Sequence, residues 1–426
     1  MGLRLTSAVT IGKLAGLVSQ RLNLGGGTTF PGLLVRKLDP SSLRLLSHRL
    51  PQGAIVVTGT NGKTTTTRMI SNMLSAAGWR VVHNRSGANL VTGVVSALAR
   101  DASLAGQPRA DVGLFEVDEA MLPAMVGEAS PRVVVITNLF RDQLDRYGEV
   151  DYVAAVWRKA LRGLGPGSTL VLNADDPLVA SLGRDYLERA EPGPRVLYYG
   201  IQDASKGRPQ LDHAADSKNC TECGTPYRYE VVYYGHVGQY ACPGCGLRRP
   251  QPQVYAASVQ PDGLRGTEVR LGTPAGNLLV RVSIPGLYNV YNALAAASAG
   301  LALDLGSNAV RQGVERFTAA FGRIERVSAD GREVYLVLVK NPVGFNQVLH
   351  TLFSGDEKRR VFILINDNFA DGTDVSWLWD VDFELMADKV EFAVTAGTRG
   401  EDMANRLKYA LVEPSLVTSM GNLHHP

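Results

Sequence analysis

Residues 56 to 69, VVTGTNGKTTTTRM, decide the fold that we expect for this chain. The common phosphate-binding loop reads G-x-x-x-x-G-K-[ST]. That pattern would place a glycine at position 57, where the chain has Val57, and the nearest glycine is Gly59. The stretch is therefore either a nucleotide-binding loop of a shorter type or a Gly/Thr-rich turn that contains GKT by chance.

The residues on either side favour a nucleotide site. Ala54–Thr58 is a β-branched run that is typical of a buried strand. Apolar residues then recur at helical spacing, and Gly78 is the expected stop; they are Met69, Ile70, Met73 and Leu74. A strand, a glycine turn and a helix in this order direct free backbone N–H groups at a phosphate. In such a loop Lys63 reaches the β- and γ-phosphates of ATP, and the Thr64 hydroxyl holds Mg²⁺.

The whole-chain composition is that of an ordinary globular protein. The 426 residues suffice for two or three domains, and 45% are hydrophobic and 20% charged. The net charge of +3 indicates neither a nucleic-acid partner nor an anionic membrane. No apolar run approaches the length of a transmembrane segment, and the N-terminus lacks a signal-peptide pattern. We therefore expect a cytoplasmic location.

All four cysteines fall in one short region, as two C-x-x-C pairs. The pairs are Cys220/Cys223 and Cys242/Cys245, and a glycine follows each of them. This spacing is typical of a zinc ribbon in which four thiolates hold a structural Zn²⁺. Tyrosine and valine alternate between the pairs, which predicts a hairpin. The rival interpretations are two disulfides or a redox motif, and both suit a reduced cytosol less well.

The strand and helix patterns predict an α/β protein. Apolar runs alternate with helical patterns from Ile55 onward, which favours a doubly wound parallel sheet. We expect an N-terminal helical segment over 1–50 and a central ATP-binding domain over 51–320, interrupted by the zinc ribbon at about 215–250. A smaller Rossmann-like α/β domain follows over 327–426. Its expected strands are Val334–Val339, Val361–Ile365 and Phe392–Thr395.

Carboxylates follow several of the predicted strands. Glu116 comes directly after one strand, and the polar runs 137–146 and 173–177 follow two others. Ligands of doubly wound sheets bind at the carboxyl ends of the strands. Glu116 is therefore a candidate to hold the Mg²⁺ of the nucleotide, and the alternative is a solvated acidic helix start.

Taken together, these motifs resemble the Mur ligase superfamily of ATP-dependent cell-wall enzymes, whose short loop reads GTNGKT(T). The shortened loop is thus a family variant. Further superfamily marks occur at Asn138-Leu139 with Asp142 and Asp145, at Asn173-Ala174-Asp175, at Tyr288–Leu294 and at Gly322-Arg323-Ile324-Glu325.

The resemblance is closest to one branch, the synthetase subunits that amidate lipid II. The branch features are the cysteine insertion, NLFRDQLDRYGE, KNPVGFNQVL (340–349), NDNFADGTDVSWLWDVDFE (366–384) and RLKYA (406–410). This resemblance implies that ATP phosphorylates the α-carboxylate of D-glutamate in the stem peptide of lipid II. Ammonia then attacks the acyl phosphate and forms D-isoglutamine.

The resemblance also implies a nucleotide site and its cofactors. ATP and Mg²⁺ would bind at the loop, with two asparagines and an arginine from later motifs nearby. The implied residues are Gly59, Thr60, Asn61, Gly62, Lys63, Thr64, Thr65, Glu116, Asn289, Asn292 and Arg323.

The chain departs from typical Mur ligases at three places. About 50 residues before the loop cannot form a domain for a uridine diphosphate handle, which is consistent with a lipid-linked substrate. Trp157 stands where many relatives have a carbamylated lysine, with Lys159 two positions on, and Gln143 replaces a metal-binding histidine. The last strand and helix of the family are expected to be missing or replaced.

The branch further implies a partner, a glutaminase subunit of the GatD type. Such an enzyme needs a cysteine nucleophile, and all four cysteines of this chain are assigned to zinc. The run 366–374 follows a strand and contains three aspartates. By the resemblance, Asp374 orients the catalytic histidine of the partner, with Asp371 as second candidate. Without the family resemblance, the run 366–374 fits an ordinary Asx-rich turn equally well.

Two other functions remain open from the sequence. The chain could be a regulatory subunit that binds ATP without catalysis, although the intact Lys63, Thr64 and Glu116 argue against this. It could also be a stand-alone ligase that adds an amino acid instead of ammonia.

Overall fold

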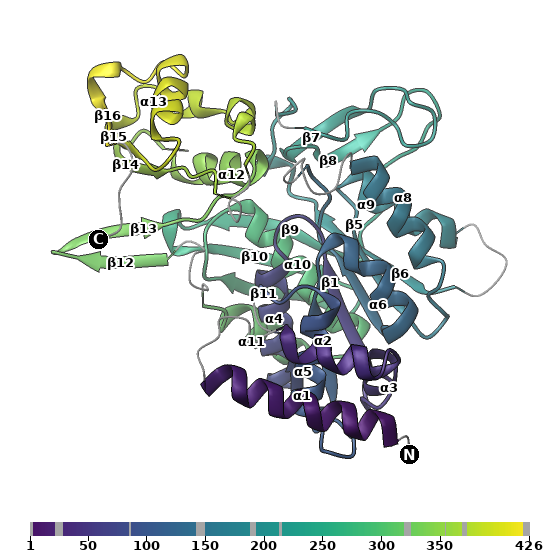
Figure 1. Cartoon of the computed structure of the whole chain (residues 1–426). Helices are drawn as coiled ribbons and strands as arrows, with labels where there is room; N and C mark the ends of the chain where they lie inside the picture. Colours follow the sequence, from purple (N-terminus) through teal and green to yellow (C-terminus); the bar gives the residue numbers. More distant parts are fainter. Residues whose placement is uncertain are drawn as a thin grey trace.

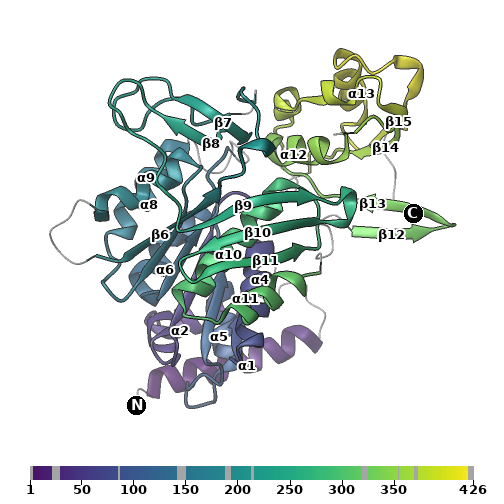
Figure 2. The same ribbon diagram turned by 180° about the vertical axis from the view of Figure 1, so that it is seen from behind.

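A large mixed sheet organises the first three quarters of the chain (Figures 1 and 2). The computed structural model describes residues 3–21, 29–84, 87–141, 150–187, 193–212, 215–318, 325–353, 355–368 and 373–420. Within them, nine strands pair in the order β11-β10-β9-β6-β5-β4-β1-β3-β2. These strands are β1 (Ala54–Thr58), β2 (Val81–His83), β3 (Val112–Glu116), β4 (Val133–Ile136), β5 (Thr169–Asn173), β6 (Arg195–Ile201), β9 (Val254–Pro261), β10 (Thr267–Thr273) and β11 (Gly276–Val282).

The predicted parallel sheet is confirmed for the strands around the loop. From β2 to β9 every neighbouring pair in the sheet is parallel, whereas β10 pairs antiparallel with both β9 and β11. The antiparallel edge formed by β10 and β11 was not predicted. The sequence analysis relied on strands that alternate with helices, and no α-helix lies between β9, β10 and β11. The sheet is thus mixed, with the nucleotide loop at its parallel part.

Helices cover both faces of the sheet, as buried parallel strands require. Alternate residues of β1 pack into two separate cores: Ile55 and Val57 on one face, Ala54 and Val56 on the other. The first face is covered by α4 (Lys63–Ala76), α10 (Leu287–Ala302) and α11 (Ser307–Glu315). The second is covered by α5 (Val91–Asp101), α6 (Leu122–Ala129), α8 (Val150–Leu161) and α9 (Pro177–Leu187).

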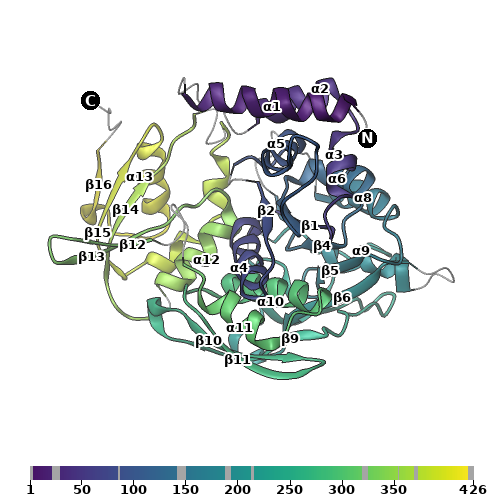
Figure 3. The same cartoon turned by 90° about the horizontal axis from the view of Figure 1, so that it is seen from below.

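The segment before the loop is helical, as predicted. It contains α1 (Leu3–Arg21), α2 (Phe30–Leu38) and α3 (Ser42–Ser47). In Figure 3, α1 and α2 lie side by side along one edge of the molecule. None of the helices in the described part of the chain is long and apolar enough to cross a bilayer.

A hairpin projects from the sheet region, formed by β7 (Arg228–Tyr234) and β8 (Val237–Ala241). These strands pair antiparallel, which confirms the hairpin predicted between the two cysteine pairs. Its base packs against the central core through Tyr233 and Tyr234. The cysteine pairs flank the outer end of the hairpin.

A separate hairpin precedes the C-terminal sheet along the chain. The expected strand Val334–Val339 overlaps β13 (Arg332–Leu336), which pairs antiparallel with β12 (Glu325–Ala329) in a separate two-stranded sheet instead of joining the C-terminal sheet. Asp330 and Gly331 form its turn with φ of 50° and 74°. An Asp-Gly pair is a strong two-residue hairpin signal, because both turn residues must adopt positive φ.

The C-terminal domain is a three-stranded parallel sheet with its own core. The strands are β14 (Arg359–Leu364), β15 (Val390–Ala396) and β16 (Val417–Ser419), in that order. Its helices are α12 (Pro342–Leu352) and α13 (Gly400–Tyr409), with short 3₁₀ turns η4 (Ser376–Asp380) and η5 (Phe383–Met386). The predicted strands Val361–Ile365 and Phe392–Thr395 are confirmed, with each boundary within two residues. The short β16 forms the last edge.

Candidate active site

The glycine loop joins β1 to α4 at the carboxyl end of the central strand. Gly59 and Gly62 have φ of 125° and 85°, a backbone conformation that L side chains rarely adopt. A Cβ atom at Gly59 would lie 2.2 Å from Oγ1 of Thr137, and one at Gly62 would lie 2.0 Å from Oδ1 of Asn292. Glycine is therefore required at both positions. Lys63 is the first residue of α4, so the loop ends at a helix N-terminus.

The functional side chains of the loop point at carboxylates. Thr64 Oγ1 donates to Oε1 of Glu116 at 2.8 Å, and Lys63 Nζ lies 3.1 Å from Oε1 of Glu119. The side chains of Lys63 and Glu119 are only 11% and 7% exposed, so this ion pair is sheltered from water. Lys63 also donates to the carbonyl oxygen of Gly59 at 2.6 Å. The lysine is thus folded back over its own loop, where the phosphates of a nucleotide would otherwise be its partners.

Two hydrogen bonds between Asn84 and the backbone of Glu116 hold Glu116 in position. The Glu116 N–H donates to Oδ1 of Asn84, and Nδ2 of Asn84 returns a bond to the Glu116 carbonyl oxygen at 2.7 Å. Nδ2 of Asn89 lies 3.3 Å from the same carboxylate oxygen that accepts from Thr64. A hydroxyl and a carboxylate held together at a phosphate loop are the oxygen ligands that Mg²⁺ prefers. The residues present therefore fit a magnesium–nucleotide site.

The segment after β4 holds the loop in place through hydrogen bonds. The Asn61 N–H donates to Oδ1 of Asn138 at 2.9 Å, and the Thr60 N–H donates to the Asn138 carbonyl oxygen at 3.0 Å. Thr137 Oγ1 donates to the carbonyl oxygen of Asn61 at 2.7 Å. Thr60 exchanges side-chain bonds with the backbone of Phe140. The sequence placed the Asn138 motif at a strand end, and this contact gives it a physical role.

Asn289 and Asn292 lie in the first turns of α10, beside the loop. Nδ2 of Asn292 donates to Oδ1 of Asn289 at 3.1 Å, and Thr66 Oγ1 lies 3.5 Å from Oδ1 of Asn292. Both asparagines are buried. The structure therefore brings these two sequence-predicted residues to the nucleotide loop.

A third asparagine reaches the loop from the C-terminal domain, and the sequence analysis missed it. Asn341 caps α12 by accepting from the Gly344 N–H at 2.8 Å, and its Nδ2 donates to Oδ1 of Asn61 at 3.1 Å. The sequence analysis identified KNPVGFNQVL (340–349) as a feature of the family branch but did not predict that it contacts the loop. A polar residue before a helix-starting proline was the only available signal.

Asp175 and Asp176 lie just after β5 and make buried contacts that stabilise the fold. Asp175 is fully buried, accepts from Tyr291 Oη at 2.6 Å, and forms an ion pair with Arg249. Burial raises the pKa of Asp175, and Arg249 opposes this shift. Asp176 accepts from the N–H of Leu139 at 2.8 Å. These carboxylates therefore hold the segments behind the loop in place.

Trp157, which the sequence comparison with Mur ligases singled out, lies on α8. Its ring is fully buried and Nε1 donates to the carbonyl oxygen of Glu119 at 2.9 Å. Lys159 is exposed on α8. The indole thus supports the backbone of Glu119, whose carboxylate pairs with Lys63.

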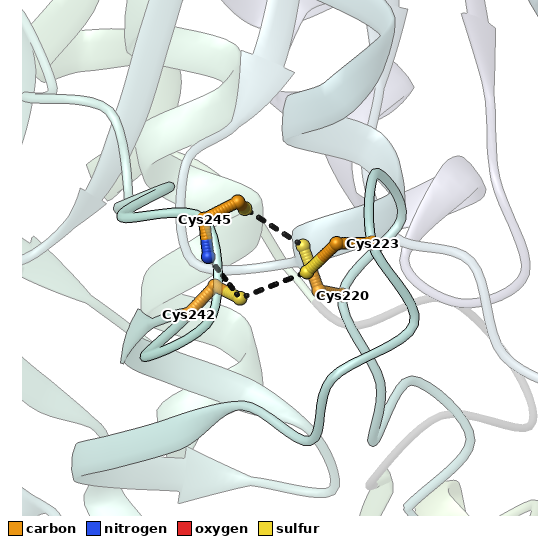
Figure 4. A group of neighbouring side chains, drawn as sticks. All are labelled: Cys220, Cys223, Cys242 and Cys245. Atoms are coloured by element: carbon orange, nitrogen blue, oxygen red, sulfur yellow. Dashed lines mark hydrogen bonds between the residues drawn. The ribbon is translucent and has the colours of Figure 1, made fainter.

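The four cysteines converge at the outer end of the hairpin (Figure 4). Sγ of Cys220 lies 3.6 Å from Sγ of Cys245, and Sγ of Cys223 lies 3.4 Å from Sγ of Cys242. All four are free thiols rather than disulfides. A tetrahedral Zn²⁺ with Zn–S bonds of about 2.3 Å has sulfur–sulfur edges of about 3.8 Å. The cluster therefore has the size and ligand set of a zinc site.

The two cysteine pairs adopt the same local turn. The Gly224 N–H donates to the carbonyl oxygen of Cys220 at 2.9 Å, and the Gly246 N–H donates to that of Cys242 at 3.0 Å. These glycines have φ of 71° and 77°, as the predicted tight turns require. The two cysteine pairs are thus presented by matching tight turns.

Arg208 and His350 join the central and C-terminal domains. Arg208 Nη1 donates to Nε2 of His350 at 2.6 Å, and Arg208 also pairs with Asp212. Burial, with the nearby Arg208 charge as the second cause, lowers the pKa of His350 to about 4. His350 is therefore neutral at neutral pH. Arg141 adds further ion pairs, with Asp216 and, at 4.0 Å, Asp380.

Asp374 lies in the C-terminal domain, just before η4, and is exposed. Its Oδ1 accepts from the Ser376 N–H at 2.8 Å, and the hydrogen bonds of the Ser376 side chain and backbone lower its pKa. The structure does not bring Asp374 to the nucleotide loop. Asp371 and Arg323, the other predicted site residues of this part of the chain, lie outside the described residues, as do Asp142, Gln143 and Asp145.

Comparison with known proteins agrees with this geometry. The family model described as Mur ligase middle domain matches residues 57–240, and the one described as MurT ligase C-terminal matches residues 338–425. A lipid II isoglutaminyl synthase (glutamine-hydrolyzing) subunit MurT from Staphylococcus aureus strain COL is 32% identical over 416 residues, covering 97% of this chain and 90% of that protein. The subunit of the same name from Streptococcus pneumoniae is 35% identical over 420 residues, with the same coverage. The chain belongs to the MurT family.

Solved structures share the fold of this MurT family member. A pseudomurein peptide ligase type C from Methanothermus fervidus superposes with a TM-score of 0.65 at 25% identity, covering 88% of this chain and 69% of that one. Mycobacterium tuberculosis folylpolyglutamate synthase, solved with ADP, superposes with a TM-score of 0.61 at 18% identity, covering 90% and 85%. The second likeness concerns the fold alone.

Proposed function

We propose that this chain catalyses the ATP-dependent amidation of the D-glutamate α-carboxylate in the stem peptide of lipid II. The observation that carries the proposal is the assembled Lys63–Thr64–Glu116 site in a chain that matches lipid II isoglutaminyl synthase subunits over 97% of its length. The product would be D-isoglutamine in a peptidoglycan precursor.

The reaction needs an activated carboxyl group, because a carboxylate is a poor electrophile. A carboxylate oxygen of the substrate attacks the γ-phosphorus of ATP, and ADP leaves with the bond electrons. Ammonia then attacks the carbonyl carbon of the acyl phosphate, and inorganic phosphate leaves as the amide forms. The residues proposed to bind ATP are those predicted from the sequence, namely Gly59 to Thr65, Glu116, Asn289, Asn292 and Arg323.

The loop residues would act mainly through position and charge. Lys63 would exchange its bonds to Glu119 and Gly59 for the β- and γ-phosphates. Thr64 and Glu116 would hold Mg²⁺, which neutralises the charge that develops on the transferred phosphoryl group. Asn341 would bring the C-terminal domain against the loop and so close the site from that side.

We also propose that the four cysteines hold a structural Zn²⁺, and that ammonia comes from a GatD-type glutaminase subunit. The two relatives are subunits of a glutamine-hydrolysing synthase. Each of the four cysteines of this chain is in the cluster, so a cysteine nucleophile must belong to another chain. Asp374, or Asp371 in second place, would orient the catalytic histidine of that subunit.

The exposed face of the C-terminal sheet supports a contact with this partner. Phe362, Leu364 and Phe392 point outward from β14 and β15 and are 44% to 55% exposed. The segment that holds Asp374 follows β14. An uncovered apolar sheet face beside an exposed carboxylate is what a docking glutaminase would use.

The test is reconstitution of the chain with its co-purified partner, followed by an assay with lipid II, ATP and glutamine. The expected product differs from the substrate by the replacement of one hydroxyl group by an amino group, with one ADP formed for each product. A product heavier by an amino-acid residue would instead identify a stand-alone ligase. Nucleotide binding without any turnover in the complex would identify a regulatory subunit.

A further inference from the structure

The outward side of α1 carries a continuous stripe of apolar side chains. Four large residues on this helix are exposed, and they are Ile11 (43%), Leu14 (57%), Leu17 (59%) and Val18 (54%). Their spacing of three and four residues places them on one face. The opposite face is already buried in the core through Leu5, Ala8 and Val9. A single exposed leucine needs no explanation, but a contiguous stripe does.

The neighbouring helix extends this stripe. Phe30 and Leu33 of α2 are 48% and 41% exposed. The two helices touch closely: a Cβ atom at Gly12 would lie 2.4 Å from Cγ2 of Val35, and one at Gly16 would lie 3.5 Å from Cγ of Pro31. We refer to the six exposed side chains, Ile11, Leu14, Leu17, Val18, Phe30 and Leu33, as the α1–α2 patch.

The ionisable side chains of α1 and α2 have one sign, although Arg36 pairs with Glu128 of α6, and Arg4 and Lys13 donate to the carbonyl oxygens of Leu38 and Arg100. Every ionisable side chain of these two helices is basic, and the first acidic residue of the chain is Asp39; the basic residues are Arg4, Lys13, Arg21, Arg36 and Lys37. Arg4 and Arg21 are exposed and lie at the two ends of the stripe on its own face. The whole-chain net charge of +3 conceals this local segregation, because acidic residues elsewhere compensate for it.

We propose that the α1–α2 patch docks on the surface of an anionic lipid bilayer. An interfacial helix buries its apolar face among the acyl chains while its cations contact anionic headgroups. Arginines at both ends of the stripe suit this position, because their long side chains extend to the headgroup level. The inference rests on the proposed function in one respect: a lipid-linked substrate would be presented at such a surface.

A second copy of the chain fits the patch less well. Parallel pairing of two α1 stripes would bring each Arg4 against Arg4 of the other copy, and antiparallel pairing would bring Arg4 against Arg21. Like charges would meet at both ends in either arrangement. In Figures 1 and 2, α1 also lies on the outside of the molecule, at the end opposite the hairpin of β7 and β8 and the C-terminal sheet. Membrane docking through α1 would leave those parts free for a partner subunit.

The experiment is co-sedimentation of the full chain with vesicles of phosphatidylcholine alone or mixed with phosphatidylglycerol. We expect binding to the mixed vesicles that weakens as salt rises, and little binding to neutral ones. Leu14→Glu combined with Leu17→Glu should lower the partition coefficient about tenfold or more, because two buried leucines are lost. Arg21→Gln should weaken binding to the mixed vesicles by about fivefold, since one basic residue near an anionic surface contributes about 1 kcal/mol.

Leu279→Glu is the matched control, because Leu279 is 52% exposed on the distant strand β11. This variant should bind as the wild type does. The inference would be overturned if Leu279→Glu lost as much vesicle binding as the patch variant, which is Leu14→Glu with Leu17→Glu. It would also be overturned if the wild type bound neutral and anionic vesicles equally, or bound neither. Wild-type dimers that become monomers in the patch variant, seen by sedimentation velocity, would make the patch a protein interface and also overturn it.

Two substrates separate this inference from the proposed function. The patch variant should amidate a water-soluble, short-chain lipid II analogue at the wild-type rate and lose activity only on substrate embedded in vesicles. If the wild type binds vesicles but amidates neither substrate, the proposed function fails while the docking surface stands. If it amidates the soluble analogue but does not bind vesicles, the docking surface alone fails.

Discussion

Asn341 of the C-terminal domain donates through Nδ2 to Oδ1 of Asn61 in the nucleotide loop, at 3.1 Å. The same Asn341 side chain accepts from the Gly344 N–H and so caps α12. One amide group therefore links the start of a helix in one domain to the loop of the other. This arrangement allows the position of the C-terminal domain to respond to what the loop binds.

Replacement of Asn341 should separate its two roles. Asn341→Ser keeps a good N-cap, whereas its short hydroxyl cannot reach Asn61, so stability should change little while the KM for ATP rises. Asn341→Ala should lose the cap as well and lower the free energy of unfolding by about 1 kcal/mol. Urea unfolding and steady-state kinetics of the two variants test this. Equal kinetics of the serine variant and the wild type would show that the contact with Asn61 has no role in the reaction.

Lys63→Ala should reduce amidation by about a hundredfold to a thousandfold, even with ammonium in place of glutamine, because a phosphate-stabilising charge is lost. Lys159→Ala is the control, because Lys159 is exposed on α8. We expect wild-type turnover from this variant. ADP release with ammonium is the measurement, and retained activity of Lys63→Ala would remove the loop from the mechanism.

The cysteine cluster should hold about one zinc per chain. Cys220→Ser should reduce bound zinc from about one to about zero and lower the melting temperature, because the site contributes folding energy. Elemental analysis and thermal unfolding are the measurements. Ser217→Ala, next to the ribbon but outside the four thiols, should keep its zinc. Iron in place of zinc, or oxidised cysteines without any metal, would contradict the assignment.

Asp374→Asn should abolish activity with glutamine and leave activity with ammonium unchanged in the reconstituted complex. The asparagine Oδ1 can still accept from the Ser376 N–H, so the local fold is kept while the charge is lost. Asp388→Asn is a matched control at an exposed residue with φ of 60°, where asparagine is well tolerated. Loss with both nitrogen sources would instead place Asp374 in the synthetase reaction.

Acid should weaken the contact between the domains through His350. Burial, followed by the charge of Arg208, lowers the pKa of His350 from 6.5 to about 4. The unfolded chain therefore binds the proton more tightly, so this contribution is fully present above about pH 6.5 and is lost as pH falls toward 4. His350→Gln should flatten the pH dependence of unfolding in this window. His48→Gln, at an exposed histidine, should not; an identical effect of both would rule out His350 as the cause.

Much of the candidate site could be predicted because its signals are local. The loop, Thr64, Glu116 and the cysteine pairs are each encoded within a few residues, next to a strand or turn that the sequence itself indicates. Asn289 and Asn292 followed only from the family resemblance, since nothing in their own helix indicates a nucleotide. Asn341 was missed because its partner Asn61 is far away in the sequence, and a helix cap explains its identity without any contact to the loop.

The sequence by itself determined the strand, glycine loop and helix over 54–76, the parallel sheet around them and the tight turns at the two cysteine pairs, because short-range periodicity and turn chemistry specify them. Only the tertiary structure decided that Asp175 is an internal ion-pair residue, that β12 and β13 form a separate hairpin, and that α1 exposes an apolar stripe. The physical reason is that strand pairing and burial depend on which distant surfaces meet. The same apolar pattern on α1 fits a buried helix or an exposed one until its neighbours are in place.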